Sequence, residues 1–351
     1  MENNNSNGNV GDFIHKEVRP AEKRRDTVIQ SWWTRPCRGN RDVVKAMLYM
    51  MALSLAYAHR SGYRVHMHTD GYGAELLKGF GYDNLLTTLD AMPESVPTEL
   101  FAAGKFFALR AEGTGKVHID TDVFLKMPGV LDAFYRSDNV DGICQMEEDM
   151  SLVDHSDKIQ HMHIMGYPAT TRPDWRGSMN TGIVGFNNAE LMRRYTDNYF
   201  EALKIYTAER FAAYKRANGD ANLYFDFILE QVELSFLSLN YNVYTLLPTK
   251  ECCHVADKIG YQHLQGVGKW SGKVQAKVCA LLQANDMWLY HAARKASIRL
   301  PTGSHPMRKA RTHKPYITAR LQWGGSTSPT RRQDSPSASE RRKKTGRMPL
   351  R

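Results

Sequence analysis

Two carboxylates at a spacing of two residues offer the clearest chemistry in this sequence. Asp120 and Asp122 follow a short apolar segment, 116–119, that has the composition of a buried strand. Alternate residues of an extended chain point to the same side, so both carboxylates can face one cation or its water shell. Hard oxygen ligands suit Mg²⁺ or Mn²⁺, and these ions often complete their coordination with diphosphate oxygens. Acidic turns with this D-x-D spacing are also common, so an ordinary strand-end turn is the alternative interpretation.

A second group of residues, some 140 positions later, supplies partners for such a site. His263, Gly266 and Lys269 follow one another at intervals of three residues. A neutral imidazole can act as a third ligand for Mn²⁺. A glycine lets backbone N–H groups approach phosphate oxygens, and a lysine adds compensating charge. Taken singly, each has an ordinary surface role, but their order favours a site for a metal-bound diphosphate.

Strands that alternate with helices must position these residues. This alternation predicts an α/β fold with a mainly parallel, mixed sheet and helices on both faces, in which ligands bind at the carboxyl ends of strands. A loop holding Cys252, Cys253 and His263 is expected before a last helix that ends near residue 299. The other predicted strands are 27–33, 63–68, 116–119, 142–146, 181–187 and 242–247, and the main helices are 42–60, 99–110, 189–217 and 222–239.

The positive charge of the chain is confined to its last part. The formal net charge is +10, but residues 301–351 hold 13 Lys and Arg against two acids, which leaves the first 300 residues at −1. We expect a flexible arm at 1–25, one domain at 26–300 and a disordered basic tail at 301–351. The tail can attract nucleic acid or an anionic membrane surface, whereas the domain itself gives no such signal.

Cysteine content and hydropathy favour a cytoplasmic location, with peripheral membrane contact left open for the tail. Five cysteines at irregular spacing argue against a disulfide framework and for a reducing compartment. The longest apolar run, 46–58, has 13 residues, whereas about 20 are needed to span a bilayer. We therefore interpret this run as a buried helix, and the N-terminal residues do not resemble a signal peptide.

Three motifs in order resemble the GT-A nucleotide-sugar transferases, most closely glycosyltransferase family 8. They are H-I-D-T-D-V-F-L at 118–125, N-T-G at 180–182 and H-x-x-G-x-x-K-W at 263–270. The resemblance covers about residues 26–295 and extends to uncharacterised bacterial glycosyltransferase-like proteins that open with a strand and a Trp-Thr pair, like Trp33 and Thr34. It implies a single Rossmann-like GT-A domain.

The same resemblance implies an activity and a set of site residues. A sugar would move from a nucleotide-diphosphate sugar, with a UDP-sugar as the first candidate, to a hydroxyl of a glycan, lipid-linked or protein acceptor. The transfer would retain the anomeric configuration and would serve glycan or polysaccharide synthesis. The residues it assigns are Asp120, Asp122 and His263 to Mn²⁺ or Mg²⁺, Gly266 and Lys269 to the diphosphate, and Asn180 and Gly182 to the sugar site.

Two departures from family 8 concern the residues nearest the reaction. Lys105 stands where the family usually has an arginine directed toward the nucleotide or the acids. The stretch near the reacting carbon corresponds to 230–235, and its second acid is replaced by Val232. Glu230 also belongs to a helical stripe with Asp226 and Glu233, which would equally suit a solvated face. Gln231 is the better catalytic candidate, because an amide on an apolar helix face should have a polar partner.

Polar residues at other strand ends are weaker candidates for the nucleotide site. Trp33 and Thr34 end the first predicted strand, and Asp70 ends the second. Asp70 could bind the base or ribose, although an Asp before Gly71 is as well explained as a turn residue.

Two other functions remain open at this stage. One is a nucleotidyltransferase that makes nucleotide sugars, although the expected Gly-rich basic loop has only a faint counterpart at 34–39. The other is nucleic-acid binding through the basic tail.

Overall fold

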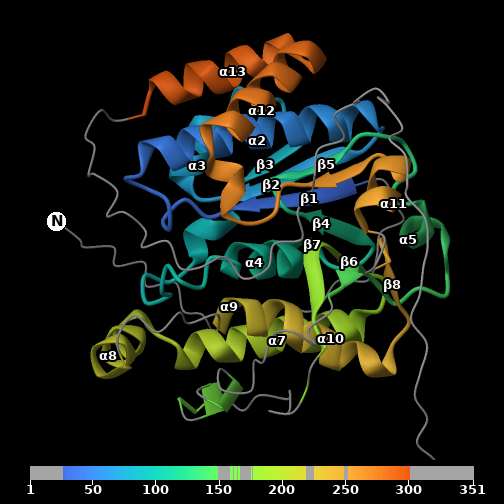
Figure 1. Cartoon of the computed structure of the whole chain (residues 1–351). Coiled ribbons are helices and arrows are strands. Elements are labelled where there is room, and N and C mark those ends of the chain that lie inside the picture. Colours follow the sequence, from blue (N-terminus) through green and yellow to red (C-terminus); the bar gives the residue numbers. More distant parts are fainter. Residues whose placement is uncertain are drawn as a thin grey trace, which may run out of the picture. The chain divides into compact units, whose positions relative to one another are not determined.

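The computed structural model in Figure 1 describes residues 27–148, 159–160, 162–163, 165–166, 175, 177–218, 225–248 and 252–300. The predicted arm and basic tail lie outside the described residues, so the expected domain boundaries stay predictions.

A mixed, mainly parallel sheet of seven strands forms the centre of the described region, as predicted. The strand order is β3-β2-β1-β4-β7-β6-β8. Four neighbouring pairs are parallel, and β7 runs antiparallel to both β4 and β6. The strands are β1 (Thr27–Trp32), β2 (Arg64–Thr69), β3 (Asn84–Leu86), β4 (Lys116–Ile119), β6 (Gly142–Glu147), β7 (Met179–Phe186) and β8 (Val243–Thr245).

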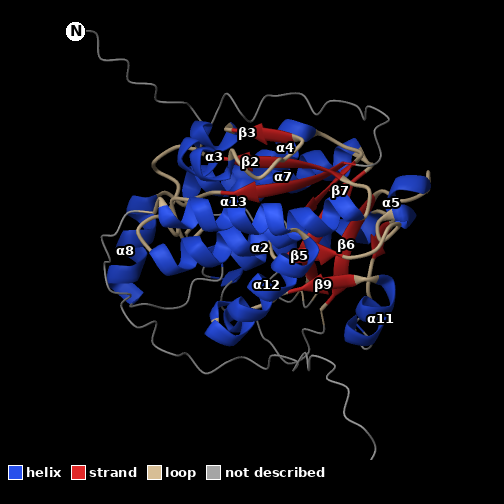
Figure 2. Cartoon of the chain, turned by 90° about the horizontal axis from the view of Figure 1, so that it is seen from above, coloured by secondary structure: helices blue, strands red, loops and turns tan. Residues whose placement is uncertain are grey.

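Helices cover both faces of this sheet (Figures 1 and 2). One face carries α2 (Arg41–Arg60), α3 (Gly71–Leu77), α12 (Gly272–Asn285) and α13 (Met287–Ile298). The other carries α4 (Ala103–Glu112), α7 (Ala189–Ile205), α9 (Phe225–Phe227), the π-helix η3 (Ile228–Val232) and α10 (Glu233–Leu237). Shorter elements are α5 (Asp132–Arg136), α8 (Ala208–Asn218), α11 (Cys252–Ile259) and the 3₁₀ turns η1 (Thr88–Ala91), η4 (Ser238–Asn240) and η5 (Val267–Trp270).

Helix α2 is the buried helix predicted from the apolar run 46–58. The Asn40 side chain caps its N-terminus by accepting a hydrogen bond from the Val43 N–H. Its inner residues, including Met50, Leu53 and Leu55, are fully buried between the sheet and α12 and α13. Among the described residues, no helix is long and apolar enough to cross a membrane.

Four local predictions differ from the structure. The helix expected at 189–217 is broken at Tyr206, and the one expected at 222–239 contains the π-helix η3. The loop expected around Cys252 is helix α11. The last helix is divided at Asp286, whose side chain accepts a hydrogen bond from the Leu289 N–H and so starts α13 as a new helix.

Candidate active site

Two three-residue strands bring the predicted metal ligands together. β5 (Val123–Leu125) pairs antiparallel with β9 (Tyr261–His263), with Val123 opposite His263. The Leu264 N–H donates to the Asp122 carbonyl at 3.0 Å and extends this pairing by one step. Since Asp122 directly precedes β5, the pairing places His263 beside it in space. Neither strand was predicted from the sequence.

The two aspartates occupy a tight turn between β4 and β5. The Asp120 N–H donates to the Gly182 carbonyl at 2.9 Å, and the Val123 N–H donates to the Asp120 carbonyl at 3.0 Å. The Asp120 side chain keeps 33% of its surface exposed, whereas that of Asp122 keeps only 5%. One carboxylate is therefore open to a ligand, and the other lies beneath it.

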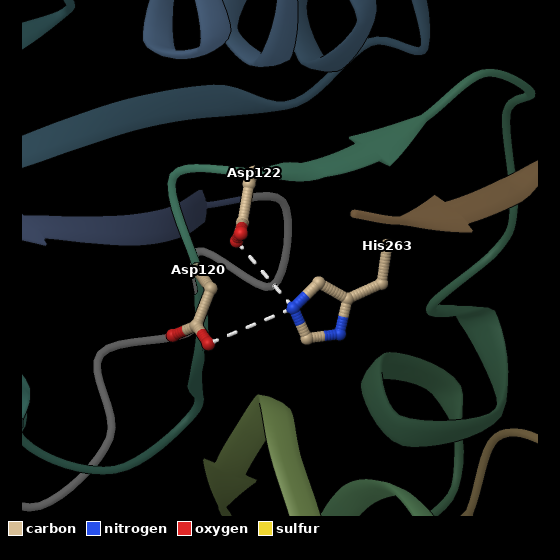
Figure 3. Close-up of side chains that lie close together, drawn as sticks. All are labelled: Asp120, Asp122 and His263. Carbon is tan, nitrogen blue, oxygen red and sulfur yellow. Dashed lines mark ion pairs between the residues drawn. The ribbon is translucent and has the colours of Figure 1, made fainter. Parts of the chain in front are cut away.

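The imidazole of His263 faces both carboxylates (Figure 3). Its Nε2 lies 3.4 Å from Asp122 Oδ1 and 4.0 Å from Asp120 Oδ2. Its Nδ1 lies 2.7 Å from Gln145 Oε1, an acceptor, so Nδ1 carries a proton and donates it to this amide. Nε2 faces two anionic groups, and a cation between them would stabilise this arrangement. One ligand atom from each of the three residues lies within 4.8 Å of the ligand atoms of the other two. The donor set therefore fits Mn²⁺ or Mg²⁺.

Gly182 lies directly against this imidazole. A Cβ at this position would lie 2.5 Å from His263 Nδ1 and 2.5 Å from Gln145 Oε1. The absence of a side chain thus makes room for the ring and for the hydrogen bond that orients it. The expected contact of Gly182 with the sugar stays a prediction.

Lys269 reaches the same centre from the other side of Asp122. Its Nζ lies 2.6 Å from Asp122 Oδ2. Burial alone would raise the pKa of Asp122, but Lys269 and His263 hold it below its usual range. Lys269 belongs to η5, which starts after Gly266, and Gly266 has the left-handed φ of +70° that favours glycine. Gly266 therefore sets the turn that directs Lys269 inward.

A second lysine, which is buried, connects Asp120 to the π-helix. Lys105 on α4 is 4% exposed, and its Nζ lies 3.0 Å from Asp120 Oδ1 while forming a second ion pair with Glu230. It also donates to the Thr181 carbonyl at 2.8 Å, and the Thr181 hydroxyl donates to Glu230 Oε1 at 2.6 Å. Burial alone would lower the pKa of Lys105, but Asp120 and Glu230 raise it above its usual range.

The acidic stripe of the π-helix region is buried, so its interpretation as a solvated face is wrong. Asp226, Glu230 and Glu233 are 2%, 7% and 1% exposed. A π-helix widens the turn by one residue and is often found at functional sites. The Tyr199 hydroxyl and the Ala102 N–H donate to the Asp226 carboxylate at 2.6 and 2.7 Å. Burial and the charge of Glu230 nevertheless raise the pKa of Asp226 to about 7.

Two further candidates lie close to this network. Gln231 Oε1 is buried without a hydrogen-bond partner among the described residues, so the expected polar partner is not found there for this oxygen. Asn180 accepts a hydrogen bond from the Gly182 N–H at 3.0 Å and donates to Glu148 Oε1 at 2.8 Å. Their catalytic roles stay predictions.

The weaker candidates at the ends of β1 and β2 form a separate hydrogen-bonded group. Asp70 caps α3 by accepting from the Gly73 N–H at 2.9 Å, and its other oxygen accepts from the Thr34 N–H and hydroxyl at 3.0 and 2.6 Å. These contacts correspond to the turn-forming alternative. Trp33 is 7% exposed, with the Arg35 guanidinium 4.4 Å from its ring centre. Contact with a nucleotide stays a prediction for all three candidates.

Sequence reasoning missed two residues that shape the site. Gln145 orients His263, and Thr181 joins Lys105 to Glu230. One feature of the sequence could have pointed to Gln145, because it is a polar residue between the apolar Cys144 and Met146 of strand β6, and it is 3% exposed. Buried polar side chains of this kind generally have a specific partner.

Comparisons with known proteins give one family match and several distant structural similarities, two of which are described here. The model of a "Family of unknown function (DUF6734)" matches residues 27–291. No curated protein matches the chain. The apo form of mouse xyloside xylosyltransferase 1 has 12% identity and a TM-score of 0.34, over 63% of this chain and 84% of its own. The galactosyltransferase LgtC, solved with donor and acceptor sugar analogs, has 12% identity and a TM-score of 0.34, over 74% and 96%. Scores this low carry no argument about activity.

Proposed function

The chain belongs to the DUF6734 family, and from its own site we propose that it is a metal-dependent glycosyltransferase. It would transfer a sugar from a nucleotide-diphosphate sugar to a hydroxyl acceptor, and a UDP-sugar is the first donor to test. One observation carries the proposal: ligand atoms of Asp120, Asp122 and His263 lie within 4.8 Å of one another. Lys269 forms an ion pair with Asp122 beside them. The order of the three motifs along the chain supports the same assignment.

Asp120, Asp122 and His263 would hold Mn²⁺ or Mg²⁺. When bound, such an ion stabilises negative charge that develops on a departing diphosphate. The chain provides the geometry for this before any ligand arrives, because Gln145 fixes the ring of His263 and the β5–β9 pairing fixes its position. A preformed ligand set avoids reorganisation at the moment of reaction.

Lys269 would provide the second positive charge for the diphosphate. Its Nζ pairs with Asp122, and its side chain remains 25% exposed, so it can turn toward an anionic ligand with a small movement. Its Nζ also lies 5.3 Å from the centre of the Trp270 ring. The η5 turn that starts at Gly266 would offer backbone N–H groups to the same oxygens.

Lys105 and Glu230 would position the reacting groups. Lys105 holds the open carboxylate of Asp120 and the buried carboxylate of Glu230 in one network. Glu230, Gln231 and Asn180 would then face the sugar and support charge on its reacting carbon. Retention, which the family-8 resemblance implies, demands no strong base from the protein, since the departing phosphate can accept the proton of the acceptor hydroxyl.

The test is metal-dependent release of nucleoside diphosphate from a panel of nucleotide sugars. We expect release with Mn²⁺ for one or a few donors, slow without an acceptor, and none in Asp122→Asn. The matched control is Asp132→Asn on helix α5, whose side chain is 40% exposed and pairs with Arg136 at 2.9 Å, and which should keep full activity. Full activity in Asp122→Asn would refute the assignment, and pyrophosphate release from a nucleoside triphosphate and a sugar phosphate would favour the nucleotidyltransferase.

A further inference from the structure

Helix α13 forms an outer layer over α2 and α12, on the side away from the sheet (Figures 1 and 2). Its inner side is buried and small or apolar, with Leu289, Ala293 and Ala296 against the core. Its outer side is therefore the part of the helix available to a partner.

The outer side of α13 is unusually apolar for a surface helix. Met287, Trp288 and Ile298 are 51%, 58% and 67% exposed. They are three of the nine exposed large hydrophobic side chains among the described residues, within a helix of 12 residues. Exposed apolar groups that gather on one element mark an interaction site more often than scattered ones do.

Positive charge accompanies these apolar side chains. Arg294, Lys295 and Arg299 are exposed on or next to the same helix. Helices α12 and α13 contain no acidic residue, and Asp286 between them caps α13. The acid on α3, Glu75, is paired with Lys78 at 2.6 Å and also interacts electrostatically with Arg299. This segment is therefore basic, although the first 300 residues together are close to neutral.

The chain continues from this helix into its strongest concentration of positive charge. Residues 301–351 carry a net charge of +11 and start directly after Leu300, two positions after Arg299. The exposed apolar and basic residues of α13 therefore adjoin the basic segment along the sequence.

We propose that the α13 face, defined by Met287, Trp288, Arg294, Lys295, Ile298 and Arg299, docks on an anionic lipid surface. Basic side chains are attracted to anionic headgroups, and Trp, Met and Ile can enter the boundary between headgroups and acyl chains. A nucleic acid would match the charge but would leave three large apolar groups without a partner, so it is the less favoured occupant. The inference does not depend on sugar transfer.

The test is flotation of the full chain with phosphatidylcholine vesicles, with and without a third of phosphatidylglycerol. We expect binding only to the anionic vesicles, reduced by salt. Trp288→Ser with Ile298→Ser, and separately Arg294→Glu with Lys295→Glu, should each lower the partition coefficient at least about tenfold. All substituted side chains are exposed, so circular dichroism and the thermal midpoint should stay close to wild type.

Matched controls separate this surface from general effects. Phe101→Ser removes an apolar side chain that is 65% exposed away from α13. Arg216→Glu with Lys258→Glu reverses two exposed charges on α8 and α11. Both controls should bind within about twofold of wild type. In addition, anionic vesicles should shift the tryptophan emission of wild type to the blue, and this shift should shrink in Trp288→Phe.

Three results would overturn the proposal. The first is a wild-type chain that does not float with anionic vesicles. The second is wild-type binding by both α13 variants, which would assign membrane attachment to residues 301–351 alone. The third is salt-dependent binding of duplex DNA without vesicle binding, which would favour nucleic acid as the partner.

Discussion

Replacing Gly182 by alanine adds one methyl group against the imidazole of His263. The new Cβ would lie 2.5 Å from His263 Nδ1 and Cε1 and 2.5 Å from Gln145 Oε1, whereas ordinary contact begins near 3.4 Å. The ring or the amide must therefore retreat by about 0.9 Å. Gly182 is not among the glycines with a left-handed φ, so alanine fits its backbone and the effect is confined to this contact.

A retreat of this size breaks the hydrogen bond that orients His263. The Nδ1 to Oε1 distance is now 2.7 Å, and a further 0.9 Å would place it beyond hydrogen-bonding range. Loss of the partner that orients a metal-bound histidine typically lowers metal affinity by about 10- to 100-fold. We therefore expect the Mn²⁺ dissociation constant of Gly182→Ala to rise by about that factor. Overpacking should also lower the free energy of unfolding by about 1–3 kcal/mol.

The assay is a titration of the full chain with Mn²⁺, in which the spin-resonance signal of the free ion gives the bound fraction. Gly79→Ala is the matched control, because a Cβ there meets nothing within 4 Å, and it should bind Mn²⁺ like wild type. Gln145→Leu removes the same hydrogen-bond acceptor without adding a methyl group at position 182, and it should also weaken Mn²⁺ binding. Wild-type Mn²⁺ affinity in both Gly182→Ala and Gln145→Leu would show that His263 is not a ligand.

Three further changes test the charges and the turn around the site. Lys105→Met leaves Asp120 and Glu230 without their shared cation and should lower the free energy of unfolding by about 3–5 kcal/mol in urea titrations. Adding Glu230→Gln should restore part of this stability. A loss below about 1 kcal/mol in Lys105→Met would contradict the network. The pKa of Asp226 is raised to about 7 from an ordinary 3.8, so its contribution to stability is complete below about pH 4 and is lost as pH rises through 7. The urea midpoint of wild type should therefore fall across this window more than that of Asp226→Asn, and parallel curves would count against it. Gly266→Ala forces a left-handed φ on alanine and should cost about 1–2 kcal/mol, and an unchanged urea midpoint would be evidence against that turn.

The sequence predicted the sheet and the acidic pair well because both depend on short-range patterns. Strand 116–119 was predicted with its correct bounds, and α2 began one residue earlier than expected. Alternation of apolar runs with helical periods is enough to predict these elements. The positions of Asp120 and Asp122 follow at once, because they are the first polar residues after a buried strand.

The contacts that complete the site could not be predicted in this way. β5 and β9 have three residues each, too few for a period, and they pair across about 140 positions. Periodicity also treats 226–233 as a regular α-helix, whereas the π-helix changes which side chains share a face. The ion pair between Lys105 and Glu230 joins two helices 125 positions apart, and in the sequence Glu230 had the pattern of a surface residue.

The balance of charge in this site indicates why a cation and an anionic ligand should bind together. Asp120, Asp122 and Glu230 provide three negative charges, and Lys105 and Lys269 provide two positive ones. The carboxylates thus outnumber the lysines by one, and a diphosphate alone would approach uncompensated negative charge. A divalent ion reverses the sign of the cluster and allows Lys269 to leave Asp122 for the ligand. Each ligand therefore improves the site for the other, and linkage requires the two effects on affinity to be equal.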